Sequence, residues 1–513
     1  MKFASLKRRH KAALIAAAVF ALLVLAAVAA MLMRDANQVV MNTGCSTGIP
    51  EPEAAVPLAP IGDSRADRVQ DVVIYYASSD YKELVATVKQ VSAGGDVTLE
   101  EAVVRAALAV PNAQGLAALG ASDIQLLSLE VAQGVATVNL SIDARRLEPE
   151  RLHMLRAAIV DSLIELGGID GVNVLIDDRD EGIIQLPSGT MSWMDIDLEA
   201  LWHQARDEDA RCAQPGGQTL ERRATLYFGA PGGQYMLPEV RTLDIEGGNY
   251  LGEVIEQLLS GPDDAQSHTR LLPPGVQYLR EAPEIVTSAG GAKIAVVSFT
   301  GAASDYLERN GIPTALAFGS LARTVCGFVP EVEGVLCDID GIMVSELYDA
   351  SGQLQYTFDD GIMRRGDFDS LVGDMVKAYY PANDYASLRG VDVAVSRYDV
   401  GSPRALLKLL MAAPMGQNLV RAMPDGVTDA DVLGVRVERD QVLVNLSGAF
   451  YQACAGMRPE RARALVYSIV NTMCSLDGIR SVRFYFDGER VDSLASAISM
   501  RGPLLSNSGI VQP

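Results

Sequence analysis

The sequence predicts an α+β protein in which three tandem β-β-α-β-β-α-β domains follow a single N-terminal transmembrane helix. One observation is an uncharged run of 22 residues near the N-terminus, long enough for a spanning helix. The second is that the same order of strand-like and helix-like patterns recurs three times. The third is that landmarks recur at a spacing of 151 or 152 residues: Tyr75, Tyr227 and Tyr379 in the first strands, and Pro111, Pro262 and Pro414 after the first helices. Tandem copies of one domain explain this spacing.

Composition bounds the classes of function. The chain has 513 residues, which suits about three or four domains. Its net charge of −22 argues against a nucleic-acid-binding surface, since such surfaces cluster Lys and Arg. The same charge argues against binding of the bulk of the chain to an anionic membrane surface. We expect an acidic body with sizeable cores.

Residues 1–34 are interpreted as a cytoplasmic N-terminus and a membrane anchor. Basic residues precede the uncharged run 12–33, which predicts an external body on a single-pass membrane protein. Two alternatives stay open: a cleaved signal peptide, for which Ala27-Val28-Ala29 matches a cleavage site, and a lipoprotein attached at Cys45. Residues 35–69, which are rich in proline, form a predicted extended linker.

The predicted domains cover 70–192, 221–348 and 373–495. In the first, strands are predicted at 71–76, 84–91, 126–131, 135–141 and 172–177, with helices from Thr98 and at 149–166. In the second, strands are predicted at 225–228, 235–243, 285–287, 293–299 and 335–340, with helices at 250–259 and 314–327. In the third, strands are predicted at 375–379, 390–396, 432–438, 442–447 and 482–486, with helices at 403–411 and 466–475. Between and after them lie an acidic helical linker (193–220), a linker with a hairpin extension (349–372) and a C-terminal tail (496–513) with little pattern.

Six cysteines fit a compartment outside the cytoplasm without requiring disulfides. Cys326 and Cys337 bracket a helix end and the next strand, so they are the candidate disulfide pair. Cys454 and Cys474 bracket a helix and could pair only if the chain folds back along it. No C-x-x-C spacing is present, so no zinc site is predicted.

Catalytic and cofactor motifs are absent from the sequence. None of the four histidines has a metal-ligating partner at a suitable spacing, and no phosphate-binding or nucleophile motif occurs. We therefore predict no cofactor, no metal and no enzymatic activity. Three positions remain as candidate interaction or motif residues: Tyr379 in a first strand, Asn471 in a second helix, and Asp487, which is in register with Asp177 and Asp340.

The third domain closely resembles the GerM domain family, which is linked to sporulation and spore germination. The residues that carry the resemblance are 376–380, Ala412-Ala413-Pro414, 442–447, Tyr467-Ser468-Ile469-Val470-Asn471-Thr472 and Val482-Arg483-Phe484. The second domain is similar in 226–228, 235–240 and 258–262, but has Arg323-Thr324 where the third has Asn471-Thr472. The first keeps Val138-Asn139-Leu140-Ser141 and has Asp161-Ser162 there. The resemblance implies a non-catalytic, envelope-anchored protein that acts in assemblies.

Two classes of function follow. One is a scaffold or binding component of the cell envelope, whose partners are envelope proteins or further copies of the chain. The other is a protein that binds or hydrolyses peptidoglycan, although a hydrolase needs two positioned carboxylates and no second acid is in register with Asp487.

Overall fold

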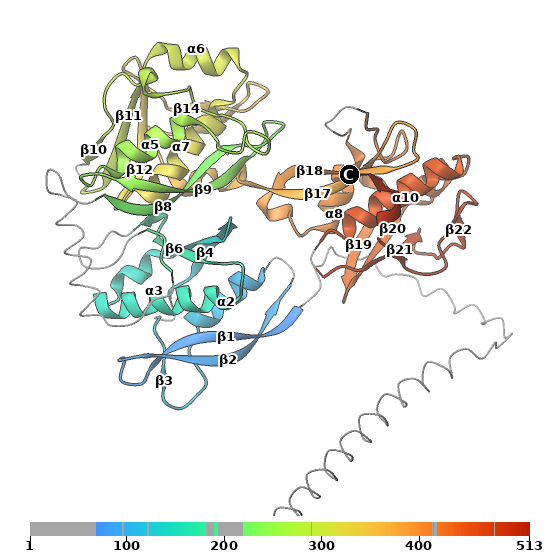
Figure 1. Ribbon diagram of the computed structural model, residues 1–513, viewed down its shortest axis with the longest axis horizontal. Coiled ribbons are helices and arrows are strands. Elements are labelled where there is room, and N and C mark those ends of the chain that lie inside the picture. The colour runs from blue at the N-terminus through green and yellow to red at the C-terminus, as the bar shows by residue number, and fades with distance from the viewer. Residues whose placement is uncertain are drawn as a thin grey trace, which may run out of the picture. The chain divides into compact units, whose positions relative to one another are not determined.

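The computed structural model describes residues 68–94, 97–120, 123–180, 189–192, 219–288, 290–412, 414, 418–476 and 478–512 (Figure 1). The predicted anchor 12–33, most of the linker 35–69 and most of the acidic linker 193–220 lie outside them, as do Cys45 and Cys212. We call the three domains repeats 1, 2 and 3. Within the described ranges, no helix combines the length and the apolar composition that crossing a membrane requires.

Repeat 1 has the predicted order of main elements. Its strands are β1 (Arg68–Ser78), β2 (Leu84–Ala93), β3 (Leu116–Ala117), β4 (Leu126–Ala132), β5 (Val135–Leu140), β6 (Gly171–Ile176) and β7 (Arg179–Asp180), and its helices are α2 (Leu99–Leu108), η1 (Ile142–Arg146) and α3 (Pro149–Ile164). Helix α2 begins where predicted, because the Thr98 hydroxyl accepts a hydrogen bond from the Glu101 N–H.

Repeat 2 adds a helix that the sequence reading missed. Its strands are β8 (Leu220–Gly229), β9 (Met236–Ile245), β10 (Glu284–Thr287), β11 (Lys293–Phe299) and β12 (Val332–Ile339), and its helices are α5 (Tyr250–Ser260), η2 (Val276–Tyr278), α6 (Gly301–Arg309) and α7 (Thr314–Phe328). The missed helix is α6, which is short and largely polar outside Ala303 and Leu307. After it come β13 (Ile342–Met343), the predicted hairpin β14 (Glu346–Tyr348) and β15 (Leu354–Thr357), then β16 (Ile362–Met363) and η3 (Arg365–Leu371).

Repeat 3 follows the same plan. Its strands are β17 (Gly373–Pro381), β18 (Leu388–Ser396), β19 (Val432–Glu438), β20 (Gln441–Leu446) and β21 (Ser481–Phe486), and its helices are η4 (Arg397–Asp399), α8 (Pro403–Met411), η5 (Asp429–Asp431), α9 (Gly448–Cys454) and α10 (Pro459–Met473). After β21 comes β22 (Ser493–Leu494). The C-terminal tail 496–513 contains β23 (Ile498–Ser499), β24 (Leu504–Leu505), η6 (Ser508–Ile510) and β25 (Val511–Gln512), although no element is predicted beyond residue 495.

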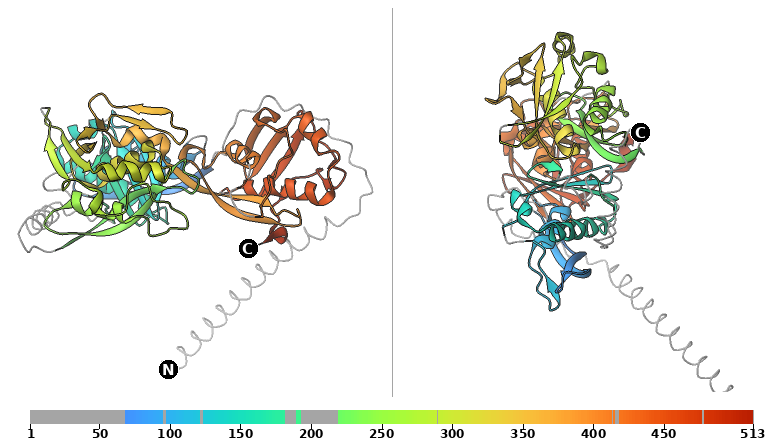
Figure 2. Two further views of the ribbon diagram at one scale, coloured as in Figure 1. Left: turned by 90° about the horizontal axis from the view of Figure 1, so that it is seen from above. Right: turned by 90° about the vertical axis from the view of Figure 1, so that its left-hand side faces the viewer.

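Each repeat contains two sheets. The first two long strands form an antiparallel hairpin, and the next three form a mixed sheet in which the middle strand pairs antiparallel to one neighbour and parallel to the other. In repeat 1 the helices α2 and α3 pack on each other and on both sheets (Figures 1 and 2). Apolar residues alternate along the strands, so each repeat buries a core of its own.

One hydrogen bond between helix and hairpin recurs in all three repeats. The backbone N–H of Tyr75 donates to the Ser162 hydroxyl at 2.9 Å, that of Tyr227 to Thr324 at 3.1 Å, and that of Tyr379 to Thr472 at 2.9 Å. This bond fixes the second helix of each repeat against its first strand. It explains why a hydroxyl residue recurs in this helix while the residue before it varies among Asp161, Arg323 and Asn471, since the acceptor is a side chain and the donor is backbone.

Removing one of these hydroxyls should destabilise its repeat. We expect Thr472→Val to lower the free energy of unfolding by about 1–3 kcal/mol, because the Tyr379 N–H loses its acceptor in a part of the repeat that excludes water. Chemical denaturation followed by circular dichroism measures the change. Thr472→Ser is the matched control, and a loss as large as that of the valine variant would contradict the assignment.

The segment that follows each mixed sheet returns to cover the free edge of its last strand. We call these segments edge straps. Met191 bridges Val172 on β6, β16 pairs with β12 at Leu336 and Val335, and β24 pairs with β21 at Val482 and Ser481. The positions covered are equivalent, since Val172, Val335 and Val482 lie opposite Ala136, Ala295 and Val442 of the middle strands. An unpaired strand edge promotes aggregation, and the straps remove it.

Candidate functional site

The carboxylate of Glu130 forms the centre of a buried cluster of charged side chains. Glu130 lies on β4, on the face of the mixed sheet that points away from α2 and α3, and its side chain is 9% exposed. Its Oε2 accepts a hydrogen bond of 2.6 Å from the Tyr227 hydroxyl of repeat 2. Its Oε1 contacts the guanidinium groups of Arg323, Arg365 and Arg397.

The three arginines come from three different segments. Arg323 is in α7 of repeat 2, Arg365 is in η3 between repeats 2 and 3, and Arg397 follows β18 of repeat 3. Further contacts complete their coordination: Arg397 donates to the Leu129 carbonyl at 2.7 Å, Arg365 pairs with Asp178 at 3.3 Å, and Arg323 pairs with Asp369 and donates to the Arg365 carbonyl at 3.2 Å. We call Glu130, Asp178, Asp369, Tyr227 and these arginines the charged junction.

The charges of the junction balance when its arginines and carboxylates are ionised, since there are three of each and the Tyr227 hydroxyl keeps its proton to donate to Glu130. Burial alone would raise the pKa of the Glu130 carboxyl, but the three arginines outweigh burial and hold that pKa well below its ordinary value. Burial raises the pKa of Asp178 despite Arg365. A permanently ionised carboxylate enclosed by arginines has no proton to exchange near neutral pH. The arrangement therefore suits holding segments together better than acid–base chemistry.

The depressed pKa of Glu130 predicts how the junction responds to acid. Because the folded-state pKa lies below the ordinary value of 4.5, the stabilisation is complete above that pH and declines as the pH falls below it. We expect the difference in unfolding free energy between the wild type and Glu130→Gln to stay constant from pH 7 to about 5 and to shrink below about 4.5. Denaturant titrations at each pH measure it. A difference that already shrinks between pH 7 and 6 would contradict this reading of Glu130.

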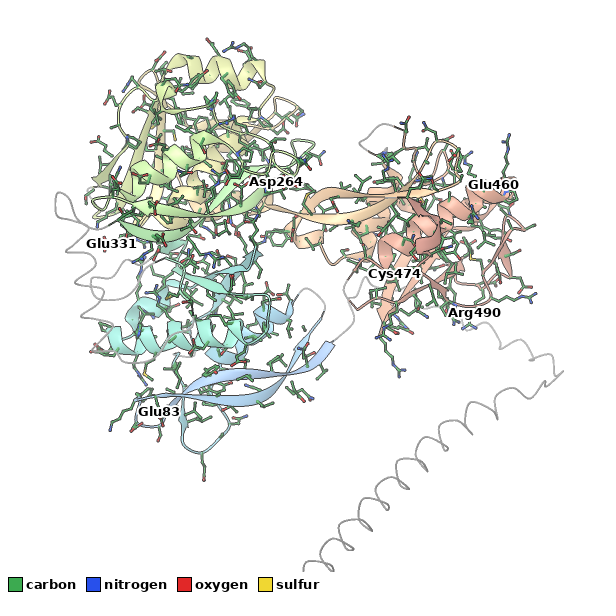
Figure 3. The ribbon with its side chains drawn as sticks, in the orientation of Figure 1. Glu83, Asp264, Glu331, Glu460, Cys474 and Arg490 are labelled. Atoms are coloured by element: carbon green, nitrogen blue, oxygen red, sulfur yellow. The ribbon has the colours of Figure 1, made fainter. Side chains whose placement is uncertain are left out.

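More polar contacts join repeat 1 to repeat 2 beside the junction. Asn173 donates to the Gly327 carbonyl at the end of α7 at 3.0 Å, and Arg179 pairs with Glu333. The backbone N–H of Glu331, labelled in Figure 3, donates to the Asp180 carbonyl at 2.8 Å. Repeat 1 therefore contacts repeat 2 through the outer face of its mixed sheet and the turn after β6.

Two of the three candidate interaction residues have structural contacts. Asp487 ends β21 in the left-handed region (φ 50°), and its carboxylate accepts a hydrogen bond of 2.9 Å from the first N–H of α9, that of Gly448. Asp340 and Asp177 adopt the same conformation at φ 50° and 54°. Asn471 makes two hydrogen bonds with the backbone of Asn507, accepting from its N–H at 2.8 Å and donating to its carbonyl at 3.1 Å. Neither residue lies beside a second acid or a nucleophile in the described contacts.

The third candidate, Tyr379, contributes its backbone to the recurring bond with Thr472. Its neighbour Tyr380 is buried and donates to the Leu409 carbonyl at 3.2 Å. Packing and backbone pairing therefore account for the paired aromatics of β17, as strand aromatics usually do.

The candidate disulfide is not formed. Cys326 in α7 and Cys337 in β12 are both free and fully buried, and burial raises the pKa of the Cys326 thiol to about 12. Cys454 and Cys474 are also free, and Figure 3 labels Cys474 at the end of α10. The expected Cys326–Cys337 disulfide is therefore wrong, and both cysteines pack as free thiols in the apolar core of repeat 2.

Histidines and acid clusters offer no site in the residues that the structure describes. His153 is buried in α3, where burial and the charge of Arg156 lower its pKa to about 4, and His268 packs edge-on against Phe228. Asp360 accepts a hydrogen bond from the Ile362 N–H in a turn. No group of three potential metal ligands converges anywhere in the described ranges.

The sequence reading missed the charged junction. Glu130 alternates with apolar residues on β4, as a solvent-facing residue would, and its partners are 97 to 267 residues away. One signal was present, because Arg323 interrupts an otherwise apolar helix at the position where the other repeats carry Asp161 and Asn471. A lone arginine in a buried helix needs a buried partner. The sequence alone does not identify the carboxylate with which Arg323 pairs.

Comparison with known proteins adds the following. The model of the family named Germane, described as sporulation and spore germination, matches residues 73–181, 225–345 and 377–492. Among solved structures, the tandem GerMN domains of the sporulation protein GerM from Bacillus subtilis match at 14% identity, covering 56% of this chain and 99% of that one with a TM-score of 0.23. A putative lipoprotein from Clostridium perfringens matches at 20% identity, covering 25% of this chain and 88% of that one with a TM-score of 0.18. No curated protein sequence matches the chain.

Proposed function

Since the chain belongs to the Germane family of sporulation and spore germination, with three tandem copies of the domain, we propose that it is a non-catalytic scaffold or binding component of a cell-envelope assembly. An N-terminal helix at 12–33 anchors it in the cytoplasmic membrane, and the repeats lie outside the cytoplasm. Its role belongs to sporulation or germination.

The observation that supports this proposal is that the candidate polar residues make structural contacts within the chain. Glu130 and its arginines join three segments, the aspartates in register terminate strands, and Asn471 binds the tail. These polar groups, which include the candidate residues Asp487 and Asn471, hold parts of the chain together. Function then depends on the surfaces that the repeats present, which is how scaffold proteins act.

Anchoring is tested by membrane extraction. We expect the full chain to stay in the membrane fraction after alkaline carbonate washing, and Leu22→Arg/Leu25→Arg to release it, because two charges in the apolar run make spanning unfavourable by roughly 2.5–3.5 kcal/mol each. The matched control is Leu58→Arg in the predicted linker. Release of the wild type would point to a cleaved signal instead.

The absence of catalysis is tested on the purified full chain incubated with peptidoglycan. We expect no soluble muropeptides above the buffer control. Release of fragments that is abolished by Asp487→Asn would overturn the scaffold assignment. Co-sedimentation with insoluble cell wall, without fragment release, would favour a wall-binding protein over a protein scaffold.

A further inference from the structure

We propose that the outer face of the mixed sheet in repeat 3 docks on repeat 1 of a second copy of this chain, in the same manner as repeat 1 docks on repeat 2 within one copy. The inference rests on the proposed scaffold function and names its partner and surface. It follows from comparing equivalent positions across the repeats.

The docking face of repeat 1 consists of four side chains on β4, on the β4–β5 turn and at the start of β6. Their contacts with repeat 2 are Glu130 with Arg323, Gln133 Oε1 accepting from the Val240 N–H at 2.9 Å, Asp170 with Arg223 at 3.1 Å, and Asn173 donating to the Gly327 carbonyl at 3.0 Å. Two of these four positions are acids and none is basic.

All four equivalent positions in repeat 3 are arginines. Strand pairing fixes the equivalence, because Glu130 lies opposite Thr137 and Thr137 opposite Asn173, as Arg436 lies opposite Leu443 and Leu443 opposite Arg483. Gln133 and Arg439 occupy the same left-handed turn position, at φ 45° and 57°. The N–H of Asp170 donates to the Gly134 carbonyl at 2.8 Å, and that of Arg480 donates to the Asp440 carbonyl at 2.7 Å.

This arginine face is open to solvent in part. Arg439 and Arg480 are exposed, the Arg436 side chain is 42% exposed beside Glu438, and Arg483 is half-buried. Leu443 lies between Arg436 and Arg483 and is itself buried, so the arginines are what this face presents to a partner. Four cations on one sheet face suit a protein surface that carries carboxylates.

The complementary surface is present in repeat 1 of the same chain. The 152-residue spacing of the first strands places Asp71 at the position of Arg223, and the aligned hydroxyls Ser162 and Thr324 place Asp161 and Glu165 at the positions of Arg323 and Gly327. Repeat 2 presents Arg223 and Arg323 to repeat 1. The equivalent surface of repeat 1 carries three acids instead.

Two of these acids, Asp161 and Glu165, lie near Tyr75, the tyrosine that corresponds to Tyr227. The Tyr75 hydroxyl donates to Glu165 at 3.1 Å, and burial together with the charges of Glu165 and Asp161 raises the pKa of Tyr75 to about 12. Asp71 and Glu165 are exposed, whereas Asp161 is buried in α3. In the docked pair Arg480 would face Asp71 and Arg483 would face Glu165, so both exposed acids gain a cation.

The contact is heterologous, because repeat 3 of one copy uses a different surface from repeat 1 of the next. Such a contact leaves repeat 3 of the second copy free and therefore propagates from copy to copy. An anionic membrane or wall polymer would also meet the arginines, but the match of Arg480 with Asp71 and of Arg483 with Glu165, position by position, favours a second copy of this chain.

Charge reversal on the purified full chain in detergent tests the proposal by analytical ultracentrifugation over a concentration series. We expect the wild type to self-associate, and Arg480→Glu/Arg483→Glu or Asp71→Arg/Glu165→Arg to raise the apparent dissociation constant roughly tenfold or more. When the two variants are mixed, the new glutamates of one meet the new arginines of the other. Both ion pairs then form with their charges exchanged, so the mixture should associate. Lys408→Glu/Arg458→Glu is the matched control, since Lys408 on α8 and Arg458 just before α10 are exposed cations elsewhere on repeat 3.

Thermal unfolding of each variant verifies that the exchanged surface residues leave the fold intact. A wild type that stays monomeric, or an association that the reversals leave unchanged, would overturn the inference. Binding to phosphatidylglycerol vesicles that Arg480→Glu/Arg483→Glu abolishes, without self-association, would also overturn it and assign the face to lipid. These results leave the scaffold proposal standing with a different partner, whereas peptidoglycan turnover would remove the proposed function itself.

Discussion

Glu130→Gln is expected to lower the free energy of unfolding by about 3–5 kcal/mol, because it leaves three arginines around a neutral amide in a buried site. The loss should appear as an earlier first transition in urea, since the junction joins separate repeats that need not unfold together. Glu284→Gln is the matched control. Glu284 holds the equivalent position on β10 of repeat 2, where it is exposed, so its change should stay within about 0.5 kcal/mol.

The junction prediction has a clear contrary outcome. If Glu130→Gln and Glu284→Gln shift the first transition equally, the three arginines do not depend on the carboxylate. The site would then contribute packing and no net electrostatic stabilisation.

The second large effect is expected at Asn471. Asn471→Ala removes both hydrogen bonds to the backbone of Asn507, and we expect it to cost about 1–3 kcal/mol, because partly buried backbone groups lose their partners. It should also loosen the edge strap of repeat 3, raising the amide exchange of Leu504 and Leu505 against that of β20.

Asn507→Ala provides the control, since both bonds use the backbone of residue 507 and survive the substitution. The alanine loses only the side-chain bond to the Gly509 N–H. A loss of stability in Asn507→Ala as large as in Asn471→Ala would mean that the tail is held by something other than this pair.

The repeated plan was predictable from sequence because it depends on local patterns. Alternating apolar residues mark β4, β5 and β6, a capping threonine marks α2, and the spacing of Tyr75, Tyr227 and Tyr379 relates the repeats. The short helices α6 and α9 were missed because each buries few apolar residues.

The charged junction and the edge straps could not be read in the same way. They depend on pairings between residues far apart in sequence, such as Glu130 with Arg397, and on strands of two residues such as β16 and β24. Neither leaves a periodic signal. The predicted pairing of Cys326 with Cys337 failed for a related reason, since proximity in sequence does not determine which way two core side chains point.

The edge straps impose an order on the biosynthesis of the chain. A polypeptide emerges from its N-terminus at about 5–20 residues per second, and its domains begin to fold as they appear. The sheet of repeat 2 keeps an open edge until Ile362 and Met363 have been made, and that of repeat 3 until Leu504. The contacts of Glu130 are completed late, because Arg397 is synthesised 267 residues after it. Until Arg323 has been made, 193 residues later, Glu130 therefore has no arginine partner, and a chain truncated before that residue leaves this face of repeat 1 uncovered.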